Sequence, residues 1–278
     1  MLKCQKTGKE EGRKEYMIFD THAHYDDEAF NEDRDELLGS LSANGIEAVV
    51  NISSDLESID ATLKLTRQYP QVYGAAGIHP CDTEALNEEN FEHVCTAAAD
   101  PRIVAVGEIG LDYYWDKARQ ETQKYWFERQ LELAREVKRP VVIHSREAAK
   151  DTLDIMKAHK SGEIGGVIHC FSYGTEMARE YLNMGFYLGI GGVLTFNNAK
   201  KLKEVAAYAP LDRLVLETDC PYLSPVPFRG KRNSSLNLPY VVKAMAELKG
   251  LTEAEIILAT NRNAKALYRL ALPDTAEK

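Results

Sequence analysis

MIFDTHAH, at residues 17–24, decides between the two α/β folds that suit a chain of 278 residues. Its apolar start is typical of a buried parallel strand, and it runs directly into two histidines. An open, doubly wound sheet that binds a dinucleotide would carry a G-x-G-x-x-G turn at this point. The His-Ala-His ending favours a closed barrel, in which chemically active side chains follow the strands.

Further runs rich in valine and isoleucine follow, bounded by glycine or proline and separated by helix-like stretches. Each interval between them is long enough for one helix and two short loops. The pattern predicts a single (β/α)8 barrel of the TIM type over residues 17–272, with the active site at the carboxyl ends of the strands. The further runs are 48–54, 72–80, 103–112, 140–146, 165–172, 186–195 and 214–222.

Polar segments flank the predicted barrel. Residues 1–16 carry five basic and three acidic side chains without apolar periodicity, so we expect a flexible arm there and a flexible tail at 273–278. No apolar run is long enough to cross a bilayer and no signal peptide is evident, so we expect a cytoplasmic protein without membrane association. The net charge of −9 argues against binding through a broad electropositive surface. It does not exclude a phosphodiester substrate, because bound divalent cations can dominate the local field.

Potential metal ligands lie at the downstream ends of five of the predicted strands. His22 and His24 are two residues apart, so both imidazoles leave the same strand face. Unpaired carboxylates are costly inside a barrel, and metal coordination would stabilise Glu108 and Asp219 there. Because all strand ends of a barrel meet at one mouth, the sequence predicts a shared metal site. The candidate ligands are His22, His24, Glu108, His144, His169 and Asp219.

This ligand set exceeds the needs of one tetrahedral ion, so we expect two divalent cations. Glu108, midway in chain order, is expected to bridge them. One cation would take His22, His24 and Asp219, and the other would take His144 and His169. The residue types suit zinc, manganese, nickel or magnesium and do not select among them.

Two cysteines, Cys170 and Cys220, each adjoin a candidate ligand. Neighbouring residues on a strand point to opposite faces, so we expect both thiols to pack outside the barrel lumen. The odd total of five cysteines, with no close pair, predicts reduced thiols.

Short motifs surround these residues in a fixed order. They are FDTHAH at 19–24, GIHP at 77–80, GEIGLDYY at 107–114, HSR at 144–146, HCFS at 169–172, ETDCPYL at 217–223, RGKRN at 229–233 and TNRNAKALY at 260–268. Together they resemble the TatD-related metal-dependent deoxyribonucleases, within the amidohydrolase-like barrels. The resemblance extends from residue 17 to about 270 and implies the same barrel and the same ligand set.

One segment departs from the family pattern. Family members usually continue Arg-Asn-Glu-Pro where this chain has Arg232, Asn233, Ser234 and Ser235. The change leaves the start of the following helix open and touches no candidate ligand.

The resemblance implies phosphodiester hydrolysis by a metal-activated water. We expect a deoxyribonuclease with an exonuclease preference for single-stranded or free-ended DNA. Asp219 would accept the proton of the water, and Glu108 would act with it as the bridging carboxylate. Glu217 lies two residues before Asp219 on the same face, where it would orient a ligand or water, or form a salt bridge inside the barrel.

Four residues are predicted to contact the substrate. Arg146 and Arg229 are the phosphate candidates, because a guanidinium can grip two phosphate oxygens. His79 would donate a hydrogen bond to a phosphoryl oxygen or transfer a proton, unless it only caps its loop. Tyr113 and the two aromatic residues after it would stack on unpaired bases or pack within their loop. Nucleic acid is the expected partner, and no obligate protein partner is indicated.

Another substrate class remains open, because a fold does not fix its substrate. The alternatives are an amidohydrolase-like esterase, lactonase or deaminase, or a D-aminoacyl-tRNA deacylase. Many barrels of that broad group bridge their metals through a modified lysine at strand four, where this chain has Glu108. A non-catalytic metal-binding or scaffold protein is disfavoured, because inactive relatives tend to lose ligands.

Overall fold

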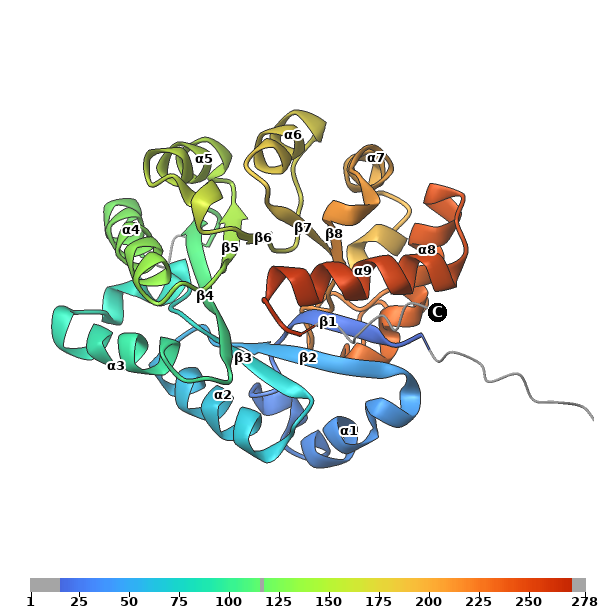
Figure 1. The fold of residues 1–278 in the computed structure, drawn as a ribbon, viewed down its shortest axis with the longest axis horizontal. Coiled ribbons are helices and arrows are strands. Elements are labelled where there is room, and N and C mark those ends of the chain that lie inside the picture. The colour runs from blue at the N-terminus through green and yellow to red at the C-terminus, as the bar shows by residue number, and fades with distance from the viewer. Residues whose placement is uncertain (1–15, 116–117, 272–278) are drawn as a thin grey trace, which may run out of the picture.

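The computed structural model describes residues 16–115 and 118–271. The arm expected at 1–16, apart from Tyr16, and the tail expected at 273–278 lie outside these ranges. The strands pair in parallel in chain order, from β1 to β8. The ring closes where Asp219 N donates to His22 O at 2.9 Å and His24 N donates to Cys220 O at 2.8 Å. The predicted (β/α)8 barrel is thereby confirmed, and the open sheet is excluded (Figure 1).

Strands and helices alternate along the described chain. The strands are β1 Ile18–Ala23, β2 Ile46–Ile52, β3 Val72–Ala76, β4 Ile103–Asp112, β5 Val141–Arg146, β6 Gly166–Ile168, β7 Tyr187–Ile190 and β8 Leu214–Leu216. The helices are α1 Arg34–Ser40, α2 Leu56–Gln68, α3 Glu88–Ala98, α4 Gln120–Glu136, α5 Ala149–Ala158, α6 Thr175–Asn183, α7 Lys200–Tyr208, α8 Leu238–Lys249 and α9 Glu253–Leu267. Within the described ranges, none of the helices has the length and hydropathy that a membrane span needs.

The last helix, α9, closes the amino-terminal end of the barrel, across whose front it runs in Figure 1. Asn263 donates to Leu214 O at 2.7 Å, at the start of β8, and the Tyr268 hydroxyl donates to Thr21 O at 2.7 Å. Leu267 and Tyr268 also join the apolar layer inside the barrel, which includes Phe19 of β1. Burial of these side chains stabilises the closed end, so the carboxyl ends of the strands form the accessible mouth.

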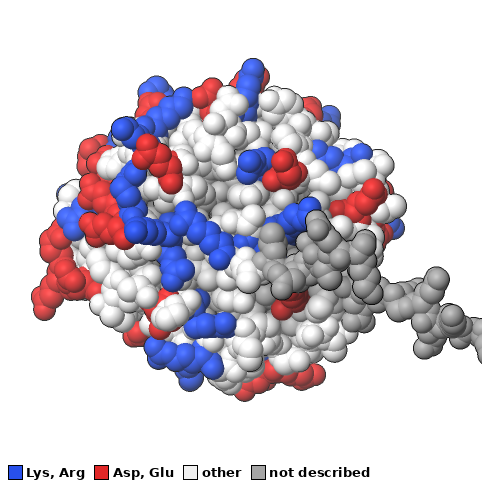
Figure 2. Space-filling view, viewed as in Figure 1, with Lys and Arg blue, Asp and Glu red and all other residues white. Residues whose placement is uncertain are grey.

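Figure 2 shows this amino-terminal face, where lysine and arginine side chains form a band across the molecule. Arginines near the strand starts donate to loop carbonyl groups. Arg102 bonds to Val72 O at 2.6 Å and Pro70 O at 2.7 Å, and Arg269 bonds to Ile164 O at 2.9 Å. Some of the arginine side chains on this face therefore stabilise loops at the end of the barrel opposite the mouth.

The helices bury apolar residues on the face toward the barrel. Phe127, Leu131 and Ala134 are all fully buried on α4. Thr252 and Glu255 form a capping box at the start of α9. Gly45, with φ of 78°, ends the short 3-10 turn Ser42–Asn44 that follows α1 rather than the α-helix itself.

Several strands are shorter than predicted. In place of 165–172 and 214–222, β6 ends at Ile168 and β8 ends at Leu216. Cys170 and Asp219 adopt φ of 44° and 56°, in the left-handed region, which ends the extended backbone. His169 and Asp219 therefore lie in the turns after their strands, still at the mouth.

Candidate metal centre

Four of the predicted ligands surround one point at the mouth. His22 Nε2 lies 3.1 Å from His24 Nε2 and 3.3 Å from Glu108 Oε2. Asp219 Oδ1 lies 3.6 Å from His22 Nε2 and 3.4 Å from His24 Nε2. The donors come from β1, β4 and the turn after β8, so barrel closure brings them together.

The other carboxylate oxygen of Glu108 faces the remaining ligands. Glu108 Oε1 lies 2.8 Å from His144 Nδ1 and 3.9 Å from His169 Nε2. His169 Nε2 also lies 3.6 Å from Asp219 Oδ1. Glu108 thus lies between two pairs of histidines. His22 and His24 are on one side and His144 and His169 on the other, which is the position that a bridging ligand needs.

Hydrogen bonds at the outer ring nitrogens decide which nitrogen faces the centre. His24 Nδ1 lies 2.9 Å from Ile52 O, which can only accept, so this nitrogen carries a proton and, in the neutral ring that binds metal, Nε2 presents the lone pair. His144 Nε2 lies 2.9 Å from Asp112 Oδ2, so in the neutral ring the lone pair of Nδ1 faces Glu108. Carboxylate and carbonyl partners of this kind orient metal-binding histidines.

Glu217 supports His169 in a similar way. Its Oε2 lies 3.2 Å from His169 Nδ1, and its Oε1 accepts from Cys170 N at 2.6 Å. The carboxylate fits because residue 189 is glycine, where a Cβ would lie 2.2 Å from Glu217 Oε2. This geometry is compatible with both roles predicted for Glu217, because a carboxylate beside His169 can orient the ring of a candidate ligand and can form an ion pair with it.

The donor set fits a divalent cation. A neutral His144 directs a lone pair at a carboxylate oxygen of Glu108, and this contact is repulsive unless a cation or proton lies between the two atoms. A divalent cation coordinated by both atoms removes the repulsion, and imidazole nitrogens with carboxylate oxygens are common ligands of such ions. The residues present therefore match the group that the sequence predicts.

The charges of the centre are strongly coupled. Burial would raise the pKa of Glu108 and Asp219, but the surrounding histidines, His169 first, hold the pKa of both carboxyl groups below their usual values. Burial favours neutral His169, yet Glu217, Glu108 and Asp219 raise its pKa to about 10. Both candidate carboxylates are therefore ionised, which is the form that coordinates metal.

His79 lies beside the centre. Its Nδ1 accepts from Cys81 N at 3.2 Å, so Nε2 carries the proton, 3.9 Å from Glu108 Oε1. Burial lowers the pKa of His79 to about 3, with His144 as the next cause. His79 thus caps its loop and also presents a neutral N–H donor to the centre.

Comparison with known proteins identifies the family. Residues 19–269 match the family model described as TatD related DNase. The chain is 43% identical over 254 residues to the uncharacterized metal-dependent hydrolase YabD of Bacillus subtilis (strain 168), with 91% of this chain and 100% of the relative covered. The chain belongs to the TatD-related DNase family. It is accordingly a metal-dependent hydrolase.

Two further TatD-family proteins are similar over almost the whole barrel. The chain is 32% identical over 256 residues to the 3'-5' ssDNA/RNA exonuclease TatD of Cronobacter sakazakii (strain ATCC BAA-894), covering 90% of this chain and 97% of that protein. The crystal structure of YJJV, a TatD homolog from Escherichia coli K12, superposes with a TM-score of 0.86 at 30% identity, covering 91% and 98% of the two chains.

Two arginines of this TatD-family barrel have their guanidinium groups against aromatic rings. Arg146 lies 3.9 Å from the centre of the Tyr114 ring and 5.4 Å from that of Trp115. Arg229 lies 4.4 Å from the ring centre of Phe196. Both arginines are exposed, and neither forms an ion pair within the described ranges, so each retains its donors for an anion.

The aromatic residues after β4 divide into two groups. The Tyr113 hydroxyl donates to Asp151 at 2.8 Å, and its ring packs against the core. Tyr114 and Trp115 are about half exposed. The Arg146 guanidinium lies over the rings of Tyr114 and Trp115, so these two aromatic residues form one exposed cluster with a cation, whereas Tyr113 is tied to α5.

Two buried aspartates near the centre were not predicted from the sequence to have a role in the site. Asp112 holds His144 through Oδ2, and its Oδ1 accepts from the backbone N–H groups of Tyr114 and Trp115 at 2.9 Å each. It therefore couples a candidate ligand to the aromatic loop. Its position four residues after Glu108, on the same strand face, was the available signal.

The second aspartate, Asp20, ties β1 to the segment after β8. It accepts from Thr218 N at 3.0 Å, Thr218 Oγ1 at 2.7 Å and Ser235 Oγ at 2.7 Å. Burial raises the pKa of Asp20 to about 7 despite these bonds. Ser235, at a position where family members usually carry proline, thus supplies a hydroxyl to this network, and α8 begins only at Leu238.

The expectation for Cys170 was wrong. Its sulfur, the donor nitrogen of His169 and an oxygen of Asp219 lie within 4.8 Å of one another. The left-handed φ of Cys170 breaks the strand alternation on which the prediction depended. Cys220 is fully buried, as a small apolar group would be.

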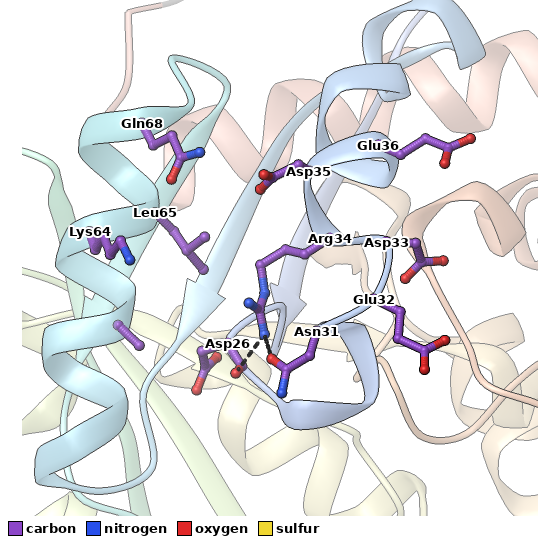
Figure 3. Close-up of a pocket in the computed structure, with 11 residues that line it drawn as sticks. Asp26, Asn31, Glu32, Asp33, Arg34, Asp35, Glu36, Lys64, Leu65 and Gln68 are labelled. Carbon is purple, nitrogen blue, oxygen red and sulfur yellow. Dashed lines mark hydrogen bonds between the residues drawn. The ribbon is translucent and has the colours of Figure 1, made fainter.

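A hollow of about 700 Å³ between the segment 26–36, which leads into α1, and α2 is separate from the centre (Figure 3). Acidic side chains are frequent around it, and none of its lining residues belongs to the candidate ligand set. Arg34 there bonds to Asp26 O at 3.1 Å and Asn31 Oδ1 at 2.8 Å. Its guanidinium is thus engaged in holding the loop after β1.

Proposed function

We propose that this TatD-family hydrolase is a phosphodiesterase that removes nucleotides from the free ends of single-stranded DNA. The observation that carries the proposal is the pair of exposed guanidinium groups without ion pairs in the described ranges, those of Arg146 at the end of β5 and of Arg229 in the segment after β8. An esterase or lactonase site has no need of two such groups, whereas a phosphodiester is anionic. The similarity to a protein named as a single-strand exonuclease supports the same reading.

Residues of the centre would hold two divalent cations. His22, His24 and Asp219 would hold one, and His144 and His169 the other, with Glu108 between them. When bound, such cations supply Lewis acidity that activates water and offsets charge on phosphoryl oxygens.

The protein groups would act around this chemistry. Asp219 has the more exposed of the two ligand carboxylates, with 19% of its side chain exposed against 5% for Glu108, so it would receive the proton of the attacking water. His79 would donate its Nε2–H to a phosphoryl oxygen. Arg146 would bind a neighbouring phosphate while Tyr114 and Trp115 stack on unpaired bases.

Arg146→Ala should raise the dissociation constant for a phosphodiester analogue about 10- to 100-fold, because one charged hydrogen-bonding group contributes about 1.5–3 kcal/mol. Metal content should not change, since Arg146 contacts none of the candidate ligands in the described ranges. Isothermal titration with a non-hydrolysable dinucleotide and metal analysis measure the two properties. Arg262→Ala, at an exposed position of α9, is the matched control. Unchanged affinity in Arg146→Ala would remove Arg146 from the phosphate site.

The test of the proposed function compares DNA forms. With manganese or magnesium, linear single strands should be degraded faster than blunt duplexes, and circular single strands should resist. Stacking on Tyr114 and Trp115 requires unpaired bases, and the acidic surface repels a long duplex. A chelator should abolish the reaction. Equal rates on circles and linear strands would exclude an obligatory exonuclease, and hydrolysis of acyl esters or lactones without any DNA cleavage would assign the alternative substrate class.

A further inference from the structure

A cavity of about 480 Å³ lies directly beside the metal centre, among the segments that follow β6, β7 and β8. Asp219 and Glu217 line it on the side of the centre. Phe171, Val193 and Leu223 give it apolar walls. Its volume is in the range of small-molecule sites, and predominantly apolar walls with a few polar groups are typical of them.

The walls of the cavity are held together by close backbone contacts. Gly192 is packed so tightly against the segment after β8 that a Cβ there would lie 2.1 Å from Leu223 O. Val226 N donates to Thr195 Oγ1 at 2.9 Å, which joins the same two segments. The cavity is therefore a preformed feature of the barrel mouth and does not depend on a single loop.

The rim of the cavity is polar and cationic. Asn198, Lys200 and Lys201 line it at the start of α7, where the amino-terminal end of the helix adds partial positive charge. Neither lysine forms an ion pair within the part of the chain that the structure describes. The cavity therefore has apolar walls, with the metal centre at one end and a cationic rim at the other. Such a site suits an anionic ligand that also carries an apolar ring, and it suits a neutral acyl group less well.

We propose that this cavity binds the terminal nucleoside of the DNA strand, with the phosphate that links it to the rest of the strand at the metal centre. The base would lie between Val193 and Leu223, and Asn198 would hydrogen-bond to its edge. A strand that ends in a preformed cavity offers its last linkage to the centre, so the cavity makes hydrolysis start at ends. The proposal rests on the phosphodiesterase function proposed above.

The experiment uses three phosphodiesters that share the p-nitrophenyl leaving group. They are thymidine 5′-(p-nitrophenyl phosphate), its 3′ isomer and methyl p-nitrophenyl phosphate, which has no nucleoside. Val193→Trp fills the cavity. In the manganese-loaded full-length protein it should lower kcat/KM for the preferred thymidine ester at least about tenfold, as loss of a fitted apolar pocket does. The kcat/KM for the methyl ester should change less than about threefold, because a methyl group does not need the cavity.

Two more variants make the result specific. Leu223→Trp fills the cavity from the more exposed segment after β8 and gives the same test if Val193→Trp does not fold. Leu258→Trp, at an exposed position of α9, is the matched control and should leave both substrates unaffected. Equal loss on thymidine and methyl esters, or no loss on either, would overturn the cavity assignment. A wild-type protein that cleaves none of the three esters and no DNA would overturn the phosphodiesterase function itself, before any variant is compared.

Discussion

Asp219→Asn is expected to lower kcat on single-stranded DNA by about 10²–10⁴-fold while the protein stays folded. The amide is a poor base and a weak metal ligand, so both proposed roles of Asp219 are lost. The fold should tolerate the change because asparagine accepts the left-handed backbone that Asp219 adopts, with φ of 56°. The backbone bond from residue 219 to His22 O, 2.9 Å long, is also preserved.

The control for this prediction is the same substitution at the other end of β8. Asp212 is exposed in the turn before the strand, and Asp212→Asn should keep wild-type turnover. Circular dichroism and thermal melting verify folding, and metal analysis establishes occupancy. If Asp219→Asn is folded, holds metal and turns over at a near-normal rate, Asp219 is not the base.

The barrel could be predicted from the sequence because its signals are local and repeated. The strand expected at 103–112 has those bounds in the structure, since its valines and isoleucines are buried along their whole length. The β6 and β8 strands were overestimated because the predicted strands continued past the apolar residues Gly166–Ile168 and Leu214–Leu216 into the polar motifs that follow them. Their backbone turns at Cys170 and Asp219, and a left-handed residue other than glycine leaves no clear mark in composition.

The convergence of the candidate ligands was predictable from strand order, but their supporting contacts were not. Asp112 and Asp20 reach partners far away in the chain, and such pairs depend on which side chains face each other after closure. Tyr113 is a comparable case, because only its position against Asp151 distinguishes it from the exposed Tyr114.

Glycines in the motif GEIGLDYY have a physical role that appears only in the structure. A Cβ at Gly107 would lie 2.6 Å from Val142 Cβ, and one at Gly110 would lie 2.0 Å from His144 O. Both glycines therefore allow β4 and β5 to approach closely on either side of Glu108. This approach brings the Glu108 carboxylate within 2.8 Å of His144 Nδ1. The glycines of the motif therefore set the distance between the two strands, and Glu108 supplies the candidate ligand.

Glu108→Gln is expected to abolish metal-dependent stabilisation and hydrolysis while the metal-free protein stays folded. Burial favours a neutral His144, but hydrogen bonds to Asp112 and Glu108 raise its pKa, so in the metal-free wild type a ring proton joins Nδ1 to the Glu108 oxygen at 2.8 Å. The amide of glutamine keeps a hydrogen bond to that nitrogen, because its oxygen can accept from the protonated ring and its N–H can donate to the neutral one. The same amide cannot bridge two cations, because it offers one weakly coordinating oxygen in place of two charged ones.

Thermal melting with and without manganese separates the two effects. A metal present at a hundred times its dissociation constant stabilises the wild-type fold by about 2.7 kcal/mol, and this gain should vanish in Glu108→Gln. Metal analysis after gel filtration should show occupancy reduced at both positions, since Glu108 stands between the two histidine pairs. Glu247→Gln, at an exposed position of α8, should behave as wild type in every measurement. A Glu108→Gln protein that binds two equivalents of metal would show that Glu108 is not the bridge, and one that loses a single equivalent would assign Glu108 to one cation alone.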